Sequence, residues 1–227
     1  MDTKNDKAWA KIFEKYNIAE EVNKNKFFEI SANQIKEFRE PRLMTKFDQK
    51  NNLPKLFLKD NLSILPITRG SYIIGKFRTY EEITYSKVET IPFSIPSFIE
   101  SIDPNNIYSE ATAINTAYAG GIINYILGEK SLQTISGRMG TGAFNFNIDV
   151  INSQCEIDAG FESHSKLILL EAKNFEIDSF NIRQIYYPYR LWRNKVKKEV
   201  IPAFFTYSND IFSFFIYRFK DIQGQER

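Results

Sequence analysis

The sequence predicts an α/β domain in which helices flank a mixed β-sheet. In the second half of the chain, strand-like and helix-like patterns follow one another in the order β-β-α-β-β, which is typical of helices packed against a sheet. The 227 residues are 43% hydrophobic and 15% aromatic, enough for one sizeable core. We therefore expect one main α/β domain with a smaller N-terminal accessory region.

The accessory region is expected over residues 1–60 and the main domain over 61–227. Apolar residues at helical spacing predict a helix over 7–16, and Ser31 is placed to cap a second helix after a short strand. Residues 40–60 predict a loop or a small helical element. Between 61 and 100 the pattern is strand-like and interrupted by turn residues.

The order of elements in the second half follows from local signals. A helix is expected over about 110–127, capped by Ser109, and its Gly120-Gly121 pair, which costs about 1 kcal/mol per Gly, indicates close packing. The other predicted elements are a tight glycine-rich loop in 136–150, a hairpin of strands 154–163 and 166–174, a helix over 179–194 interrupted near Pro188, and two strands around the turn Ser208-Asn209-Asp210.

Composition excludes several classes of site. The net charge is only +2, so affinity for a nucleic acid would have to come from local basic clusters. A single cysteine, Cys155, and a single histidine, His164, exclude an internal disulfide, a multi-cysteine zinc site and a His-rich metal site, and both are interpreted as structural. No secretory signal and no run of about 18–20 apolar residues is present, so we expect a cytoplasmic protein without a membrane partner.

The chemically informative pattern is Asp158 followed by Glu171-Ala172-Lys173. The pattern acid-x-Lys occurs three times, but only Glu171/Lys173 follows a strongly apolar strand, residues 166–170. Because side chains alternate along a strand, Glu171 and Lys173 share one face and Ala172 has the other. Asp158 lies on the preceding predicted strand, and antiparallel pairing could place it beside Glu171.

Two neighbouring carboxylates beside an apolar strand repel each other, and a hard divalent cation removes that conflict. Mg²⁺ accepts one or two carboxylates and keeps waters and phosphate oxygens as its other ligands. It can then polarise a phosphoryl group and acidify a bound water. The alternative interpretation is a buried Glu–Lys pair with a surface Asp, which is the usual role of an isolated acid-x-Lys.

The layout IDAGFES…KLILLEAKN…RQIYYPYRLW, within about residues 105–220, resembles the nuclease core of the PD-(D/E)xK superfamily. More narrowly, it is similar to a group of type II restriction endonucleases. The resemblance implies a restriction-endonuclease-like fold, Asp158 and Glu171 as Mg²⁺ ligands with the Ala172 carbonyl as a third, and Lys173 as the residue that orients the attacking water. One departure is Ile157, which stands where these nucleases often have a proline.

Two accessory residues are suggested by the same resemblance. Some of these nucleases carry a Glu on the helix before the hairpin, and Glu110 is best placed for this role, with Glu129 second. A preference of acids for helix N-termini explains Glu110 equally well. Related nucleases often carry a Gln on the helix after the motif strand, where this chain has Gln184, although an exposed structural Gln is an equal alternative.

A DNA-contacting surface is expected beside this centre. The basic residues are concentrated between 183 and 198, and helical spacing groups several of them on one face. A solvated helix face is the alternative. The residues expected to contact DNA there are Arg183, Tyr187, Arg190, Arg193 and Lys195, and Arg138 in the glycine-rich segment could reach a phosphate or remain a surface charge.

The resemblance therefore implies a Mg²⁺-dependent endonuclease that cuts double-stranded DNA at a specific site. A homodimer is expected by family analogy, because cutting both strands favours two active centres. Residues 1–60, rich in Lys, Asn and Gln, could help to contact DNA. The alternatives are a repair or recombination nuclease such as a junction resolvase, which branched DNA would distinguish, and a non-catalytic DNA-binding module, which would bind but not cut.

Overall fold

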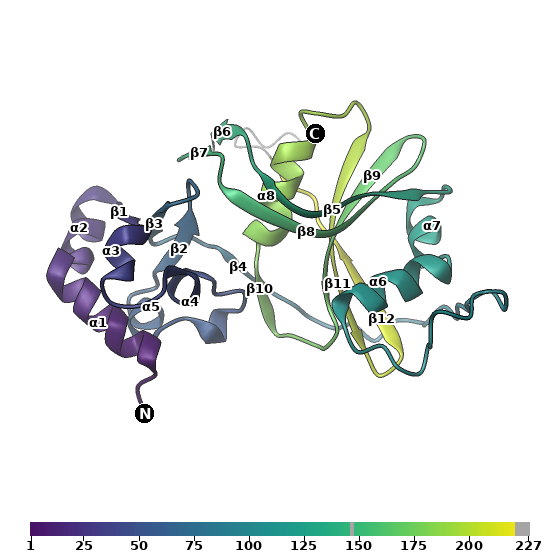
Figure 1. Ribbon diagram of the computed structural model, residues 1–227, viewed down its shortest axis with the longest axis horizontal. Helices are drawn as coiled ribbons and strands as arrows, with labels where there is room; N and C mark the ends of the chain where they lie inside the picture. The colour runs from purple at the N-terminus through teal and green to yellow at the C-terminus, as the bar shows by residue number, and fades with distance from the viewer. Residues whose placement is uncertain (146–147, 221–227) are drawn as a thin grey trace. The chain divides into compact units, whose positions relative to one another are not determined.

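The computed structural model describes residues 1–145 and 148–220, and the chain forms two compact units (Figure 1). Unit 1 consists of residues 1–82, 140–154 and 179–182, and unit 2 consists of residues 83–139, 155–178 and 183 onward. Residues 61–82, which were expected to belong to the main domain, lie in unit 1, where two of their strands complete a sheet with β1 (Phe27–Ser31). No helix in the described part of the chain is long and apolar enough to cross a membrane.

Unit 1 packs short helices against a three-stranded antiparallel sheet, in the order β1-β3-β2. Its core centres on Trp9 and Phe57, both fully buried, whose ring centroids are 4.8 Å apart. Besides β1, this part of the unit contains α1 (Lys4–Tyr16), α2 (Ile18–Asn25), α3 (Ala32–Lys36), α4 (Pro41–Thr45), the 3₁₀ turn η1 (Lys50–Asn52), α5 (Lys55–Lys59), β2 (Ser63–Pro66) and β3 (Ser71–Gly75). Two further antiparallel pairs join β4 (Tyr80–Glu82) to β10 (Ser179–Asn181) and β6 (Ala143–Asn145) to β7 (Asp149–Ile151).

Two sequence predictions for this unit are confirmed. The predicted helix over 7–16 corresponds to α1, and Ser31 caps α3. The Ser31 Oγ accepts the Gln34 N–H at 3.3 Å, and the Gln34 side chain accepts the Ser31 N–H at 2.8 Å, so each residue satisfies a backbone donor that the helix leaves free.

Unit 2 contains the expected mixed sheet, with strand order β12-β11-β9-β8-β5. The hairpin of β8 and β9 and the final pair of β11 and β12 are antiparallel, whereas β9 and β11 are parallel because α8 connects them. The bounds are β5 (Leu132–Gly140), β8 (Gln154–Glu162), β9 (Lys166–Lys173), α8 (Arg183–Trp192), β11 (Glu199–Ser208) and β12 (Ile211–Ile216). The α/β class and the predicted hairpin are therefore confirmed.

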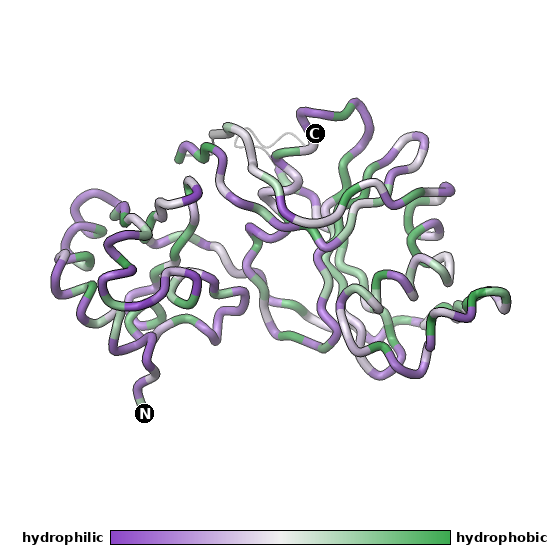
Figure 2. The backbone as a smooth tube through the Cα atoms, in the orientation of Figure 1, coloured by the Kyte–Doolittle hydropathy of each residue, from purple (hydrophilic) through white to green (hydrophobic). Residues whose placement is uncertain are grey.

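Helices cover both faces of this sheet (Figure 1). Phe161, Ile168 and Phe205 pack in one cluster with residues of α6 (Glu110–Ala119) and α7 (Ile122–Leu127). On the other face, Leu167 and Leu169 pack with Trp192 of α8. Because β9 is covered on both faces, it needs a continuous apolar run, which Figure 2 shows as hydrophobic colour along the middle strands.

The helix expected over 110–127 is instead two helices. Ser109 caps α6, as predicted, and its Oγ accepts the Thr112 N–H at 3.1 Å. The break occurs at Gly121, whose φ of +80° is a left-handed conformation that glycine adopts at little cost. No atom lies within 4 Å of a Cβ added at Gly121, so backbone conformation rather than close packing explains this glycine.

Three other segments differ from expectation because tertiary pairing decides them. Residues 132–140 form β5, so Arg138 lies on a strand rather than in a tight loop. Residues 179–181 pair with β4, so α8 begins only at Arg183 and continues through Pro188. No strand forms between residues 83 and 100, where Val88 and Ile91 remain exposed.

Candidate metal centre

The candidate centre lies where β8 and β9 separate. Their pairing extends from Glu162↔Leu167 to Ala159↔Leu170, and beyond it the Ala172 N–H donates to the Asp158 Oδ2 at 2.8 Å. Ile157 and Ala159 pack in clusters on opposite faces of the sheet, so the alternation of β8 is interrupted at Asp158. The Asp158 carboxylate thus replaces a backbone acceptor and is held beside Glu171.

Lys173 is the point on which the other side chains converge. Its Nζ lies 2.9 Å from the Glu171 Oε1, 3.0 Å from the Glu110 Oε1 and 2.8 Å from the Ala172 carbonyl oxygen. The Lys173 and Glu171 side chains are only 13% and 9% exposed. Glu110, at the first position of α6, is 40% exposed, so the centre opens to solvent on its side.

The second accessory residue also reaches the centre. Gln184 lies in the first turn of α8, and its Nε2 donates to the Glu171 Oε1. Its Oε1 is buried and has no hydrogen-bond partner among the described residues. A buried amide oxygen without a partner costs stability, so it is a place where a cation or a bound water would fit.

Glu129, the second choice for the accessory acid, lies elsewhere. It accepts hydrogen bonds from the hydroxyl and the N–H of Ser165 in the turn between β8 and β9. These bonds lower the pKa of Glu129 to about 2. Glu110 therefore supplies the acid near Lys173, and Glu129 stabilises the hairpin turn.

The centre has more carboxylates than cationic groups, and the pKa values of its residues are shifted. Burial raises the pKa of Glu171 to about 8, against the opposing effect of the Lys173 charge. Burial also raises the pKa of Asp158, although the Ala172 N–H opposes this. Burial alone would lower the pKa of Lys173, but the Glu171, Glu110 and Asp158 carboxylates together raise it. Three ionised carboxylates near one ammonium group would leave a charge of −2, and Asp158, Glu171 and Lys173 each bind protons more tightly than usual.

The donor set suits a hard cation such as Mg²⁺. It offers the carboxylates of Asp158 and Glu171 and the Ala172 carbonyl, and Mg²⁺ often takes only one or two carboxylates and keeps waters. Among the described residues, no three His, Cys, Asp or Glu side chains are grouped as a metal site. The Lys173 ammonium lies between Glu110 and Glu171, 3.0 Å and 2.9 Å from their Oε1 atoms.

The basic residues of α8 and the segment after it lie against aromatic rings. The Arg190 guanidinium carbon is 5.8 Å from the Tyr186 ring centroid, the Arg193 guanidinium carbon is 5.4 Å from that of Tyr189, and the Lys195 Nζ is 5.2 Å from the Trp192 ring. Such contacts restrict where the cations point while leaving them charged. Arg183 begins α8, directly before Gln184.

Two residues expected to contact DNA have other surroundings. Tyr187 is only 5% exposed, and burial raises its pKa to about 12, so it belongs to the packed face of α8 rather than to a surface. Arg138 pairs with Glu156 across the strands, with 3.3 Å between its Nε and the Glu156 Oε1. Both side chains of that pair are about half exposed, so Arg138 remains at the surface.

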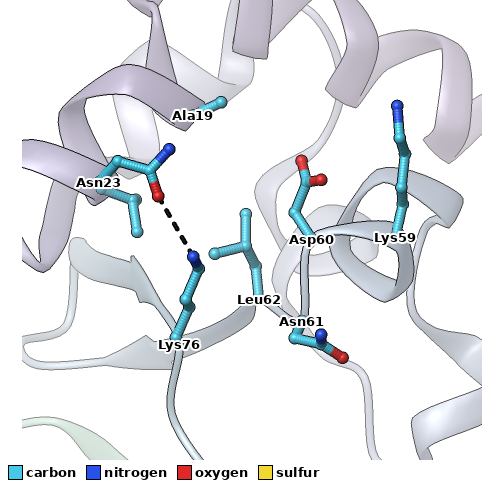
Figure 3. A pocket seen from close by; sticks show the side chains of 8 residues that line it. Ala19, Asn23, Lys59, Asp60, Asn61, Leu62 and Lys76 are labelled. Atoms are coloured by element: carbon cyan, nitrogen blue, oxygen red, sulfur yellow. Dashed lines mark hydrogen bonds between the residues drawn. The ribbon is translucent and has the colours of Figure 1, made fainter.

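Neither the residues interpreted as structural nor the cavity of unit 1 contributes a side chain to the centre. Cys155 is buried, which raises the pKa of its thiol to about 11, and His164 is exposed in the hairpin turn. A cavity of about 370 Å³ lies in unit 1, where the Lys76 Nζ donates to the Asn23 Oδ1 at 3.2 Å (Figure 3). Besides these two residues it is lined by Ala19, Val22, Lys59, Asp60, Asn61 and Leu62. None of the sequence-predicted site residues is among them.

Sequence reasoning did not find one contact at the edge of the centre. The Asn174 Nδ2 donates to the Tyr108 carbonyl oxygen at 3.0 Å and thus ties the segment after Lys173 to the segment before Glu110. The two residues are 66 positions apart and carry no shared motif, so no signal in the sequence points to this bond.

Comparison with known proteins gives the family of the chain. No curated protein and no solved structure matches it. Residues 6–74 match the family described as Domain of unknown function (DUF6996). Residues 75–226, more than half of the chain, match the family described as Domain of unknown function (DUF6997), and the chain therefore belongs to that family.

Proposed function

We propose that this chain is a Mg²⁺-dependent endonuclease that hydrolyses DNA phosphodiester bonds, with the fold of the PD-(D/E)xK nucleases in unit 2. The observation that carries the proposal is the convergence of Asp158, in the middle of β8, with Glu171 and Lys173 at the end of β9, just beyond the paired part of the two strands. A third carboxylate, Glu110, meets the same lysine at 3.0 Å. An excess of negative charge around one lysine favours a cation-binding centre over a simple ion pair.

Each residue has a role in this chemistry. Asp158, Glu171 and the Ala172 carbonyl would hold Mg²⁺, which supplies an acidified water and polarises the phosphoryl group. Lys173 has a raised pKa, so its ammonium stays charged at neutral pH and can orient the attacking water. Gln184 fixes the Glu171 carboxylate by a hydrogen bond, and Glu110 positions the Lys173 ammonium.

The proposal extends to the substrate and the assembly. The cations ordered on aromatic rings, Arg190, Arg193 and Lys195, would bind backbone phosphates, together with Arg183. A type II restriction enzyme acting at a specific double-stranded site in the cytoplasm is the form of this proposal that we favour. A homodimer would supply one centre for each strand.

The test is cleavage of plasmid DNA by the full chain with Mg²⁺ or with EDTA. Lys173→Ala and Glu171→Gln should each lower the cleavage rate by about 10²–10³-fold, the usual effect of losing one group that stabilises a transition state. Lys166→Ala is a matched control, because Lys166 is also a partly buried lysine of β9, with its Nζ donating to the Leu127 carbonyl oxygen at 2.7 Å, but lies at the opposite end of the strand from Lys173.

The products distinguish the alternatives. Discrete bands would support the restriction enzyme, and cutting confined to branched DNA would support a junction resolvase. DNA binding without cutting, equal in the wild type and the Lys173→Ala variant, would contradict the nuclease proposal and leave a binding module.

A further inference from the structure

Two exposed aromatic side chains flank the candidate centre. Tyr108 is 74% exposed and lies two positions before Glu110, and Phe175 is 49% exposed and lies two positions after Lys173. The Glu110 Oε1 and the Lys173 Nζ are 3.0 Å apart, and the Asn174 Nδ2 donates to the Tyr108 carbonyl oxygen at 3.0 Å. Both rings are therefore attached to backbone segments that meet at the edge of the centre.

Among the described residues of unit 2, Phe98 and Tyr125 are also exposed, at 82% and 60%, but Tyr108 and Phe175 are the exposed rings next to Glu110 and Lys173 in the chain. Unit 2 buries Phe161, Phe204 and Phe205 completely, whereas neither Tyr108 nor Phe175 contacts another ring within residues 1–145 and 148–220. Leaving such a ring in water forgoes the free energy of burying it. Two uncovered rings beside a polar centre therefore indicate a surface that a flat, apolar partner covers.

A nucleobase is the partner that fits this position. Aromatic side chains stack on the faces of unpaired bases, and every base offers such a face whatever the sequence. Tyr108 and Phe175 lie beside the groups that would hold the scissile phosphate, so the base they can reach belongs to a nucleotide next to the cut. A peptide or a membrane would not place a phosphodiester at the same centre.

We propose that Tyr108 and Phe175 hold an unstacked base next to the scissile phosphate. The proposal rests on the nuclease function proposed above and specifies its substrate, which is DNA whose bases are unpaired or easily unstacked at the cut. A duplex with a mismatch at that position should be cut faster than a fully paired one, because less stacking free energy is lost when the base leaves the helix.

The test uses a 2-aminopurine base in the middle of a single-stranded oligonucleotide, because its fluorescence changes when it stacks on a ring. Binding is measured in the Lys173→Ala background and in EDTA, so that the oligonucleotide stays intact during the measurement. Tyr108→Ala and Phe175→Ala should each weaken binding about tenfold and remove the fluorescence change, whereas Tyr108→Phe should preserve both. Phe175→Leu retains an apolar side chain of similar size and should behave like Phe175→Ala.

The control is Phe98→Ala, which removes an 82% exposed ring elsewhere in unit 2 and should change neither binding nor fluorescence. Unaltered thermal unfolding in every variant shows that the fold is retained. If the wild type cuts DNA and the Tyr108→Ala/Phe175→Ala double variant cuts and binds equally well, the stacking proposal is wrong while the nuclease proposal stands. If the wild type cuts no DNA, both proposals fall.

Discussion

Replacing Glu171 by glutamine should stabilise the metal-free protein while removing its activity. Glutamine retains the Oε1 that accepts hydrogen bonds from Lys173 and Gln184, so the packing of the centre is preserved. What is lost is the ionisable group, whose pKa burial raises to about 8 from 4.5. Most substitutions at buried positions destabilise a protein, so an increase in stability on losing one ionisable group would be specific to a carboxyl whose charged form is disfavoured by burial.

The magnitude follows from proton linkage. Between pH 4.5 and about 8 the unfolded chain has lost the Glu171 proton and the folded chain has kept it, so the unfolded state binds fewer protons. The free energy of unfolding of the wild type therefore falls as pH rises, by up to about 1.4 kcal/mol per pH unit. The free energy of unfolding of Glu171→Gln should exceed that of the wild type by less than about 1 kcal/mol at pH 5 and by about 3 kcal/mol at pH 7.

The assay is urea unfolding of both proteins in EDTA at several pH values from 5 to 9. The two curves of unfolding free energy against pH should diverge as pH rises and become parallel above about pH 8. Glu129→Gln is the matched control, because the pKa of Glu129 is lowered to about 2 and the group is ionised in both states throughout this range. Parallel curves for Glu171→Gln, or a loss of stability at every pH, would refute the reasoning.

Three further predictions concern the metal and the fold. Because Mg²⁺ needs ionised Glu171, the increase in Tm that Mg²⁺ produces should grow between pH 6 and 8 in the wild type and be absent in Glu171→Gln; an increase independent of pH would contradict this. Gly160→Ala should destabilise by about 1–3 kcal/mol in urea unfolding, since the new Cβ would lie 2.9 Å from the Ile135 Cβ, and an unchanged midpoint would show that Ile135 can move. Ser109→Ala should lower the free energy of unfolding by about 1 kcal/mol because it removes the cap of α6, and Ser109→Asp, which can also cap the helix, should have the stability of the wild type. Equal stability of all three proteins would exclude a capping role.

Much of the fold could be predicted because its signals are local. The capping box of Ser31 and Gln34, the cap at Ser109 and the turn Asn209-Asp210 each act within a few residues, and the structure has all of them. The errors come from interactions between distant segments. Residues 179–181 have a pattern compatible with a helix start, but pairing with β4 makes them a strand.

In the candidate site, too, local patterns predict some contacts, whereas others depend on the packing of distant segments. Alternation along one strand predicts that Glu171 and Lys173 share a face, and their side chains are indeed 2.9 Å apart. The contact of Gln184 with Glu171 and the burial of Tyr187 both depend on how α8 is rotated against the sheet. That rotation is set by packing on Leu167 and Leu169, which periodicity within the helix does not determine.

The charge balance of the centre is what distinguishes a metal-binding centre from a purely structural pair of Glu171 and Lys173. Elsewhere in the described part of unit 2, Lys198 pairs with Glu162 and Arg138 pairs with Glu156, one cation with one carboxylate in each case. A structural pair of Glu171 and Lys173 would need nothing more, yet Asp158 and Glu110 add two further carboxylates. Burial, with Asp158 and Glu110 adding to its effect, raises the pKa of Glu171, and either a proton on Glu171 or a bound cation would relieve the repulsion. The two further carboxylates at the open end of this β-hairpin are therefore what the proposed metal centre accounts for and a purely structural Glu171–Lys173 pair does not.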